Sequence, residues 1–465
     1  MATRTVHDPV GVPARAVSEL RKAMAGPVLG PGADEYDEAR TVWNRLIDRR
    51  PALIARCAGA DDVARAVRCA REHGLALSVR GGGHNVAGSA VCDGGLMIDL
   101  STMKETRVDP TARRVVAGPG LTWGEFDSAT QRFGLATTAG IVSSTGVAGL
   151  TLGGGHGWLM RRHGLTCDNV RSVELVTADG RRLRASQDEN AELFWGVRGG
   201  GGNFGIVTAF EFELHPVTTV VAGLLLYPMT RAREVLQLYR EFALTAPDEL
   251  VIHVIITIWT DGTPVIALVA CYSGDAAAAE GVFRPLRRLG DPLLDTLRSV
   301  PYREFQSSFD ATNPPGHWYY KSGYFGAGAF EQDRALDTLL DHCDFATPSI
   351  LSRVVVEGLG GAMSRVDPAA TAFVHRRAPF DLIVIAGGFE REKAPQNAAW
   401  ARKAWSAMRE FLSGGIYVNY LDGDQGAEGV RAAYGPAYER LAALKRTYDP
   451  ENVFRLNHNI QPAEG

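Results

Sequence analysis

A single histidine follows three consecutive glycines in the segment VRGGGHNVAG (79–88). Glycine costs backbone entropy and is used where the chain turns sharply or where a ligand approaches the backbone closely. Backbone N–H groups exposed at such turns form nests that bind anions. The segment therefore predicts either an anion site with His84 at its edge, or only a tight turn with a hydrogen-bonding histidine.

A second glycine cluster, GLTLGGGHGWL (149–159), has the same character, and a third occupies 199–202. The first two segments lack the G-x-x-x-x-G-K-[ST] pattern of a phosphate-binding loop. Neither lies in the strand–loop–helix unit with a downstream acidic residue that a Rossmann dinucleotide site requires. Two separate nests suit a cofactor that carries a diphosphate, and a set of tight turns is the alternative. His156 and His163 beside the second cluster read as structural, and no spacing predicts a metal site.

Two tyrosines lie three residues apart in GGIYVNYLDGD (414–424). If this segment is extended, Tyr417 and Asn419 share one face while Val418 and Tyr420 share the other. A phenol has an ordinary pKa near ~10, and cationic neighbours or hydrogen bonds to the phenolate lower it. Either tyrosine is thus a candidate base, and packing residues are the alternative.

Composition excludes several classes of function. The chain has 465 residues, a formal net charge of −4 and 45% hydrophobic residues, which is typical of a multidomain globular protein without a basic surface for nucleic acid or membranes. No window of 18 apolar residues and no leader-like apolar segment occurs near the start. The six cysteines form no C-x-x-C pair, which favours a reducing compartment. We therefore expect a cytoplasmic protein, and the Ala-, Arg- and Gly-rich usage is typical of a high-GC bacterium.

The elements that position these residues follow from local patterns. Apolar spacing predicts helices at 61–73, near 231–244, 328–343 and 396–413, and the capping box TWGE predicts another from 122 to about Gly134. Short apolar runs predict strands at 75–79, 96–101 and up to 120, and longer β-rich runs at 217–227 and 251–273. The Asp-Gly turn in WTDGTP (259–264) predicts a hairpin. Strands interspersed with helices indicate an α+β protein whose second domain, an antiparallel sheet covered by helices, is inserted into the first.

Several motifs in order resemble one known family. They are VRGGGHNVAG with DGGLMIDLS, TAGIVSSTGVAGLTLGGGHGWLMRRHGLTCDNV (138–170), LFWGVRGGGGNFGIVTAFEF (193–212), YVNYLD (417–422) and YDPENVFRLNHNI (448–460). This set is similar to the berberine-bridge-enzyme-like group of the vanillyl-alcohol-oxidase, or PCMH-type, FAD flavoproteins. The resemblance runs from about residue 35 to the C-terminus and is weakest over 217–410.

The resemblance implies a PCMH-type FAD-binding domain of two α/β subdomains at 35–215, a substrate-binding domain at 216–412 and a C-terminal segment at 413–465 that returns to the first domain. It implies that His84 is bonded to the 8α-methyl group of FAD. Neutral imidazole is a good nucleophile near pH 7, and the protein tunes the cofactor through such a link. The implied cofactor-binding residues are Arg80, Gly81, Gly82, Gly83, Asn85, Gly88, Ser89, Gly118, Gly140, Ile141, Thr145, Gly146, Gly149, Gly154, Gly157, Gly205, Val207, Tyr417, Asn419 and Asn457.

One position departs from the bicovalent members of the group. Val142 occupies the place of the cysteine that bonds the flavin 6-position in those members, and valine cannot form that bond. Cys167 lies some 25 residues later, and we expect it to be an ordinary buried thiol. A single tether through His84 is therefore expected. Thr145 matches the position on the oxygen-facing side of the flavin, with a turn threonine as the alternative.

By the same resemblance Tyr420 is the catalytic base and Tyr417 borders the flavin. In HWYYKSGYF (317–325), Tyr320 and Lys321 are expected near the substrate, although a sheet core would look similar. The expected function is an oxidase that takes hydride from a small alcohol, sugar or natural-product intermediate and reduces O₂ to H₂O₂. The alternatives are an FAD-dependent dehydrogenase or flavin oxygenase of secondary metabolism, and a non-catalytic flavin-binding protein.

Overall fold

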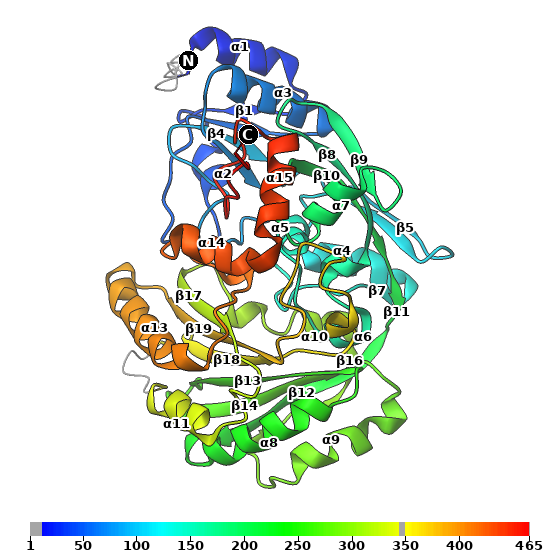
Figure 1. Cartoon of the computed structure of the whole chain (residues 1–465), viewed down its shortest axis with the longest axis vertical. Coiled ribbons are helices and arrows are strands. Elements are labelled where there is room, and N and C mark those ends of the chain that lie inside the picture. The colour runs from blue at the N-terminus through cyan, green and yellow to red at the C-terminus, as the bar shows by residue number, and fades with distance from the viewer. Residues whose placement is uncertain (1–11, 344–348, 465) are drawn as a thin grey trace.

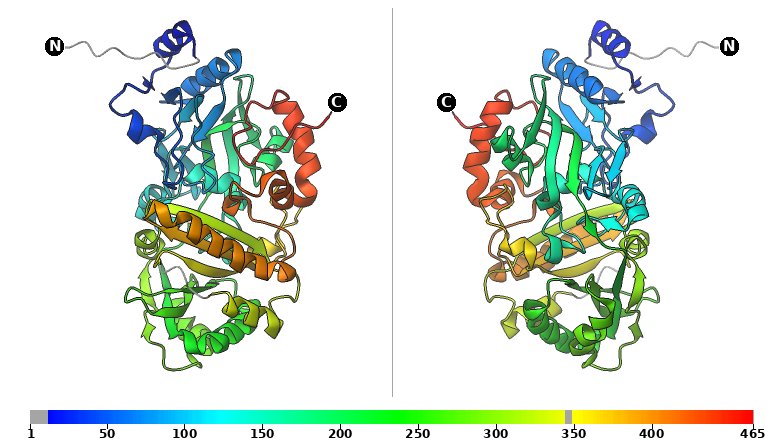
Figure 2. Two further views of the ribbon diagram at one scale, coloured as in Figure 1. Left: turned by 90° about the vertical axis from the view of Figure 1, so that its left-hand side faces the viewer. Right: turned by 90° about the vertical axis from the view of Figure 1, so that its right-hand side faces the viewer.

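The computed structural model describes residues 12–343 and 349–464, so most of the segment inspected for a leader lies outside the described range. The chain forms an upper part that contains both the N-terminal third and the C-terminal segment, and a lower part built on one large sheet (Figure 1). The side views show the C-terminal helices returning to the upper part (Figure 2). The two parts meet along one face of the large sheet.

The first small sheet carries the glycine turn that precedes His84. Its strand order is β1-β2-β4-β3, with β2, β4 and β3 parallel and β1 antiparallel. A parallel sheet is covered by helices because its crossover connections pack on its faces. The strands and nearby helices are β1 (Val28–Leu29), β2 (Leu53–Arg56), β3 (Leu77–Arg80), β4 (Leu96–Asp99), α1 (Ala14–Ala23), α2 (Tyr36–Arg40) and α3 (Ala60–Glu72).

The second sheet is antiparallel, in the order β5-β6-β10-β8-β9. Its strands are β5 (Thr106–Asp109), β6 (Arg114–Ala117), β8 (Val170–Val176), β9 (Arg182–Ser186) and β10 (Ile206–Glu213), and β7 (Leu135–Ala136) pairs separately with β11 (His215–Pro216). The helices of this region are α4 (Trp123–Thr130), α5 (Val147–Leu152), α6 (Met160–His163) and α7 (Ala191–Val197). The C-terminal helices α14 (Gly426–Tyr434) and α15 (Tyr438–Tyr448) share its hydrophobic core.

The large sheet has the order β15-β12-β14-β13-β18-β19-β17, with β16 paired to β12, and all its pairs are antiparallel. Its strands are β12 (Thr219–Pro228), β13 (Leu250–Ile258), β14 (Pro264–Tyr272), β15 (Leu294–Asp295), β16 (Arg298–Pro301), β17 (His317–Tyr324), β18 (Arg353–Gly358) and β19 (Phe380–Gly388). The associated helices are α8 (Ala232–Thr245), α9 (Ala279–Arg287), α10 (Tyr302–Gln306), α11 (Asp333–Asp341), α12 (Ala362–Arg365) and α13 (Ala394–Met408).

The two faces of the large sheet have different partners. Successive strand residues point to opposite faces, so Ile252, Val254 and Ile256 pack in the core that also contains residues of α8, α9, α11 and α13. The alternate residues of β13, such as Val251 and Ile255, pack in clusters with upper-part residues such as Trp158 and Trp43. This second face is the floor of the candidate site.

Most predicted elements are found close to their expected bounds. The 61–73 helix corresponds to α3, the TWGE box caps α4 through the Thr122 and Glu125 side chains, and Gly134 ends the following turn with φ 65°. The predicted hairpin joins β13 to β14. The structure thus has the expected α+β architecture. Its six cysteines are all buried, and no helix of the described chain is long and apolar enough to cross a membrane.

Candidate active site

A cavity of about 940 Å³ lies between the upper part and the floor of the large sheet. Ligand pockets span roughly 300–1,000 Å³, so this one is at the large end of the range. The structure brings many predicted residues to its wall, namely Gly81, Gly82, Gly83, His84, Asn85, Ser89, Ile141, Thr145, Gly146, Gly149, Gly205, Val207, Tyr320, Tyr417, Asn419, Tyr420 and Asn457.

The triple-glycine turn lies back to back with the second glycine loop. A Cβ added to Gly82 would lie 2.5 Å from the Cα of Gly146, and one added to Gly146 would lie 2.5 Å from the amide nitrogen of Gly82. Gly83 has φ +68°, a conformation that side chains other than glycine rarely adopt. The close approach of two backbones, and not only a ligand, therefore requires these glycines. Both turns still present their backbone to the cavity.

His84 is held in place by an indole and a hydroxyl. Its ring stacks on Trp43 with centroids 4.2 Å apart, and its Nε2 lies 3.3 Å from the Oγ of Ser144. Trp43 is itself fixed, because its N–H donates to the Gly83 carbonyl and its Nε1–H donates to the Asn313 carbonyl. Burial lowers the pKa of His84 to about 4, so the ring is neutral at pH 7. Neutrality is the state that a nucleophilic imidazole needs.

The tyrosine segment differs from the extended conformation considered above. Residues 418–420 form a 3₁₀ turn, because the chain must bend back over the cavity. Tyr417 and Asn419 are nonetheless neighbours, since the Asn419 Nδ2 donates to the Tyr417 hydroxyl at 2.8 Å. That hydroxyl also accepts from the backbone N–H groups of Gly155 and His156 at 2.8 and 3.2 Å. The nest expected to hold phosphate at the second glycine cluster therefore binds a tyrosine oxygen.

Tyr420 is paired with a buried carboxylate that the sequence did not reveal. Its hydroxyl donates to Glu357 Oε1 at 3.1 Å, while Glu357 Oε2 lies 3.0 Å from Nδ1 of His156. Glu357 is 1% exposed. Burial opposes ionisation of Glu357, but its hydrogen bond to His156, its electrostatic interactions with His156 and His253, and its hydrogen bond to Tyr420 outweigh burial and lower its pKa. Glu357 is therefore an ionised carboxylate that accepts the hydrogen bond of the Tyr420 hydroxyl.

The expectation that neighbours would lower the pKa of the tyrosine base is wrong for Tyr420. Burial, the charge of Glu357 and then the other nearby acids raise its pKa well above the ordinary value. Burial also raises the pKa of Tyr417. Tyr420 is consequently a neutral phenol that donates to a carboxylate. It can accept a proton from a substrate only as its own proton moves to Glu357.

Glu357 belongs to a row of ionisable residues across the large sheet. The register pairs His253 with Glu357, Glu357 with Asp381, and Asp381 with Tyr324. Burial and the charge of Glu357 raise the pKa of Asp381 well above its usual range, so Asp381 is a neutral acid. Ligating atoms of His156, Glu357 and Asp381 lie within 4.8 Å of one another. Both Glu357 oxygens are engaged by Tyr420 and His156, and the row serves here as the polar surroundings of Tyr420.

Some predicted cofactor residues lie behind the cavity wall, where they support the turns. Arg80 is ion-paired to the buried Asp99, with Nη2 2.8 Å from Oδ2. The glycines in this group are required by close packing, since an added Cβ would meet Ile47 at Gly88, Met103 at Gly118, Leu150 at Gly140, Phe373 at Gly154 and Ala139 at Gly157. These residues shape the site without facing it.

The two substrate residues expected from HWYYKSGYF separate onto opposite faces of β17. Tyr320 lines the cavity, and its ring is 6.3 Å from that of Tyr420. Lys321 points to the other face, where its Nζ lies 3.0 Å from Asp422 Oδ2 and is also paired with Asp424. The alternation of side chains along a strand explains the separation. Lys321 therefore serves as a structural ion pair in the described chain.

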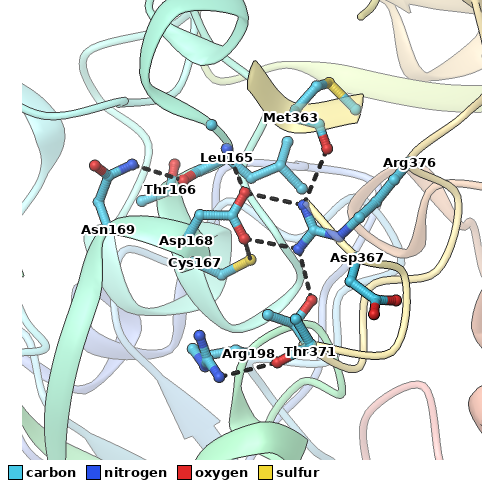
Figure 3. A network of polar contacts seen from close by, with 12 residues as sticks. Leu165, Thr166, Cys167, Asp168, Asn169, Arg198, Met363, Asp367, Thr371 and Arg376 are labelled. Atoms are coloured by element: carbon cyan, nitrogen blue, oxygen red, sulfur yellow. Dashed lines mark hydrogen bonds and ion pairs between the residues drawn. The ribbon is translucent and has the colours of Figure 1, made fainter. Parts of the chain in front are cut away.

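Cys167 lies in a buried polar network, shown in Figure 3. Arg376 is paired with Asp168 through Nη1–Oδ2 and Nη2–Oδ1 distances of 2.9 and 2.7 Å, and it also donates to the Thr371 hydroxyl at 2.6 Å. Backbone bonds from Thr166 and Cys167 to Gly155 and Gly154 connect this network to the second glycine cluster. Burial raises the pKa of the Cys167 thiol, which is therefore unreactive. Val142, by contrast, lines the cavity.

The cavity residues that the sequence did not predict include Trp43, His253, Arg353 and Glu357. The sequence held a usable signal for His253, Arg353 and Glu357. His253 in VIHVIITI, Arg353 in SRVVVEG and Glu357 in the same run interrupt or flank otherwise apolar strand sequences. Buried polar groups in apolar strands require partners and often mark functional sites. Trp43 carried no comparable signal.

Comparison with known proteins agrees with this geometry. A family profile described as "FAD binding domain" matches residues 51–186, and one described as "Berberine and berberine like" matches residues 416–461. An FAD-linked oxidoreductase of Dictyostelium discoideum is 32% identical over 452 residues, covering 96% of this chain and 97% of its own. The (R)-6-hydroxynicotine oxidase of Paenarthrobacter nicotinovorans is 31% identical over 468 residues, covering 95% and 97%.

A crystal structure of 6-hydroxy-D-nicotine oxidase from Arthrobacter nicotinovorans superposes with a TM-score of 0.86 at 30% identity, covering 95% of this chain and 98% of that one. Fold and site together define a PCMH-type flavoprotein that carries out FAD-dependent oxidation. The chain belongs to the berberine-bridge-enzyme-like family of FAD-linked oxidoreductases.

Proposed function

We propose that this protein is an oxidase with FAD bonded once, through His84, that oxidises a small organic molecule and reduces O₂ to H₂O₂. The single observation that carries the proposal is the convergence of His84 and the Tyr420–Glu357 pair on the walls of one cavity. FAD, when bound, accepts the hydride and passes both electrons to O₂. We assign 35–215 to cofactor binding, 216–412 to substrate binding and 413–465 to the segment that brings Tyr420 to the site.

His84 is suited to form the covalent link. In the tautomer whose Nε2–H donates to the Ser144 hydroxyl, Nδ1 carries the free lone pair and is the available nucleophile, and the low pKa of His84 keeps the ring neutral. The backbone of Gly81 and Gly82 faces the cavity, where it can lie against a diphosphate. Val142 stands at the position where a second, cysteinyl link would form. The valine at this position on the cavity wall supports the proposal of a single tether.

The proton leaves the substrate through Tyr420. In the oxidation of an alcohol, the hydroxyl proton moves to the Tyr420 oxygen as the Tyr420 proton moves to Glu357, and the carbon loses a hydride. The substrate thus loses two electrons and two hydrogens and becomes a carbonyl compound. Tyr420 is the catalytic residue in contact with substrate, and Glu357 is the acceptor behind it. This arrangement needs no resident phenolate, which the burial of Tyr420 disfavours.

Acid precipitation of the purified protein followed by intact-mass measurement tests the link. We expect a yellow pellet and a mass increased by one FAD, and His84→Ala is expected to release the flavin into the supernatant. A wild-type protein whose flavin stays in the supernatant would contradict the single-tether proposal.

Peroxide release tests the oxidase reaction. We expect H₂O₂ to appear in proportion to substrate oxidised, and Tyr420→Phe to lower turnover while the covalent flavin is retained. Substrate oxidation without peroxide would point to a dehydrogenase, and unchanged turnover in Tyr420→Phe would remove Tyr420 as the proton acceptor.

A further inference from the structure

The floor of the cavity has an ordered chemical pattern, and the proposed function uses only one part of it. Three rows of side chains run across β13, β18 and β19 on the face toward the cavity. The row that contains His253, Glu357 and Asp381 carries the ionisable groups next to Tyr420. The second row lies two residues farther along each strand and is apolar. The third row lies another two residues along and contains a cation.

The apolar row consists of Ile255, Val355 and Ile383, which are paired in register and line the cavity. They offer no hydrogen bond to a ligand. An aromatic corner adjoins this part of the cavity, where Trp158 lies 5.0 Å from Phe305 and 5.6 Å from Phe309 between ring centroids. Flat apolar ligands bind to such surfaces, because aromatic rings stack on one another and aliphatic chains exclude water. The many hydroxyl groups of a sugar would find few partners on this floor.

The third row contains Arg353, paired in register with Thr257 and Ile385. Among the described residues, the Arg353 guanidinium donates only to neutral acceptors, namely the carbonyls of Thr312 and Leu351 and the Oδ1 of Asn313. In the described part of the chain, no carboxylate lies within 4.0 Å of this cation. Its side chain borders the cavity. A half-buried cation that borders an apolar cavity without a counter-ion is unfavourable, so an anionic ligand would complete the site.

We propose that the substrate is a flat, mainly apolar molecule with one anionic group, and that Arg353 binds this group while the carbon to be oxidised lies at Tyr420. The inference rests on the proposed oxidase function and adds the class of substrate. Arg353 and Glu357 are four residues apart on β18, so at roughly 3.4 Å per residue their Cα atoms are about 14 Å apart. Tyr420 occupies the end of this distance of about 14 Å that is nearest Glu357. The remaining length accommodates about one ring of the substrate between the carbon to be oxidised and the anionic group.

Binding of a matched pair of ligands that cannot be oxidised as alcohols tests this inference. Isothermal titration of the FAD-loaded protein with 4-methylbenzoate and with the isosteric 4-methylbenzamide separates charge from shape. We expect the anion to bind roughly 30-fold or more tightly than the amide, the scale of a buried charge pair. Equal affinities, or binding of neither compound at millimolar concentration, would overturn the proposal.

Arg353 also hydrogen-bonds residues of the 309–313 loop, so its substitution could disturb that loop as well as remove the charge. Comparing two substitutions with both ligands separates these effects. Arg353→Gln is expected to lower the affinity for 4-methylbenzoate to that of the amide, and Arg353→Lys to keep part of the preference. Affinity for 4-methylbenzamide should be unchanged in both variants. If the affinities for both ligands fall together, Arg353 supports the loop only and the proposal fails.

Turnover separates this inference from the proposed function on which it rests. We expect peroxide release with 4-(hydroxymethyl)benzoate at a lower KM than with its methyl ester, and little with the neutral disaccharide xylobiose. If xylobiose releases peroxide, and if 4-(hydroxymethyl)benzoate has no lower KM than its methyl ester, the protein is an oxidase but the proposed substrate class is wrong. If 4-methylbenzoate binds selectively but none of the three turnover compounds releases peroxide, the proposed ligand class stands and the oxidase function is contradicted.

Discussion

Replacement of Glu357 by glutamine removes one negative charge from the site and changes little else. Both oxygens of Glu357 are in use, one by the Tyr420 hydroxyl at 3.1 Å and the other by His156 Nδ1 at 3.0 Å. A glutamine side chain has the same length, its oxygen can accept from Tyr420, and its amide group can meet His156. The variant should therefore keep the positions of both neighbours while losing the group that takes the proton.

The size of the effect follows from the role of that group. A positioned general base contributes about 10²–10⁴-fold to the rate, which corresponds to roughly 3–5 kcal/mol of transition-state stabilisation. We expect kcat to fall by this factor with KM nearly unchanged, because Glu357 reaches the substrate only through Tyr420. The pKa of Glu357 is lowered, so wild-type activity should persist as the pH falls and be lost only below the usual range of a glutamic acid. That acidic limb should be absent in Glu357→Gln.

The assay is steady-state peroxide release across pH, with flavin content of each sample measured by intact mass. Asp381→Asn is the matched control, because it makes the same carboxyl-to-amide change one strand away at an acid that is already neutral. We expect the control to retain nearly wild-type kcat. A Glu357→Gln protein with full covalent flavin and a kcat within about threefold of wild type would refute the proton-transfer path through Glu357.

Three further changes test other parts of the structure. Trp43→Ala should lower the fraction of covalently bound flavin, read by intact mass, whereas Trp43→Phe should preserve it, because stacking on Trp43 positions His84; equal fractions in the two variants would argue against this role. Burial raises the pKa of Asp127 to about 8. The folded state therefore binds this proton more tightly than the unfolded state, and the free energy of unfolding falls as pH rises from about 4 to 8. Asp127→Asn should stabilise the protein by up to about 4 kcal/mol at pH 7. Urea unfolding should show a larger gain at pH 8 than at pH 5, and a gain that does not vary with pH would be inconsistent with the titration. Lys445→Met should destabilise by roughly 3–5 kcal/mol in the same assay, since it leaves Asp449 buried without its 2.7 Å partner; adding Asp449→Asn should recover part of that loss, and an unchanged midpoint in the single variant would contradict it.

Local signals in the sequence predicted much of the fold and part of the site. The capping box at Thr122 and the Asp-Gly hairpin turn act within a few residues, and both are found where expected. The run of glycines before His84 marked the cavity wall correctly, although close packing of two backbones explains those glycines as well as a ligand does. The extended conformation considered for the segment around Tyr420 is wrong, because its bend is imposed by residues distant in the sequence.

The sequence by itself determined which side chains are available: a histidine on a glycine turn, a valine in place of a second tether, and a pair of tyrosines near the C-terminus. Only the tertiary structure decided what they face. Glu357 meets His156 across 201 positions of the chain, and Trp43 is fixed by a carbonyl 270 positions away. Strand register and the packing of the large sheet against the upper part create these contacts. Periodicity over a few residues carries no information about such pairings, because it reports only which face of an element is apolar.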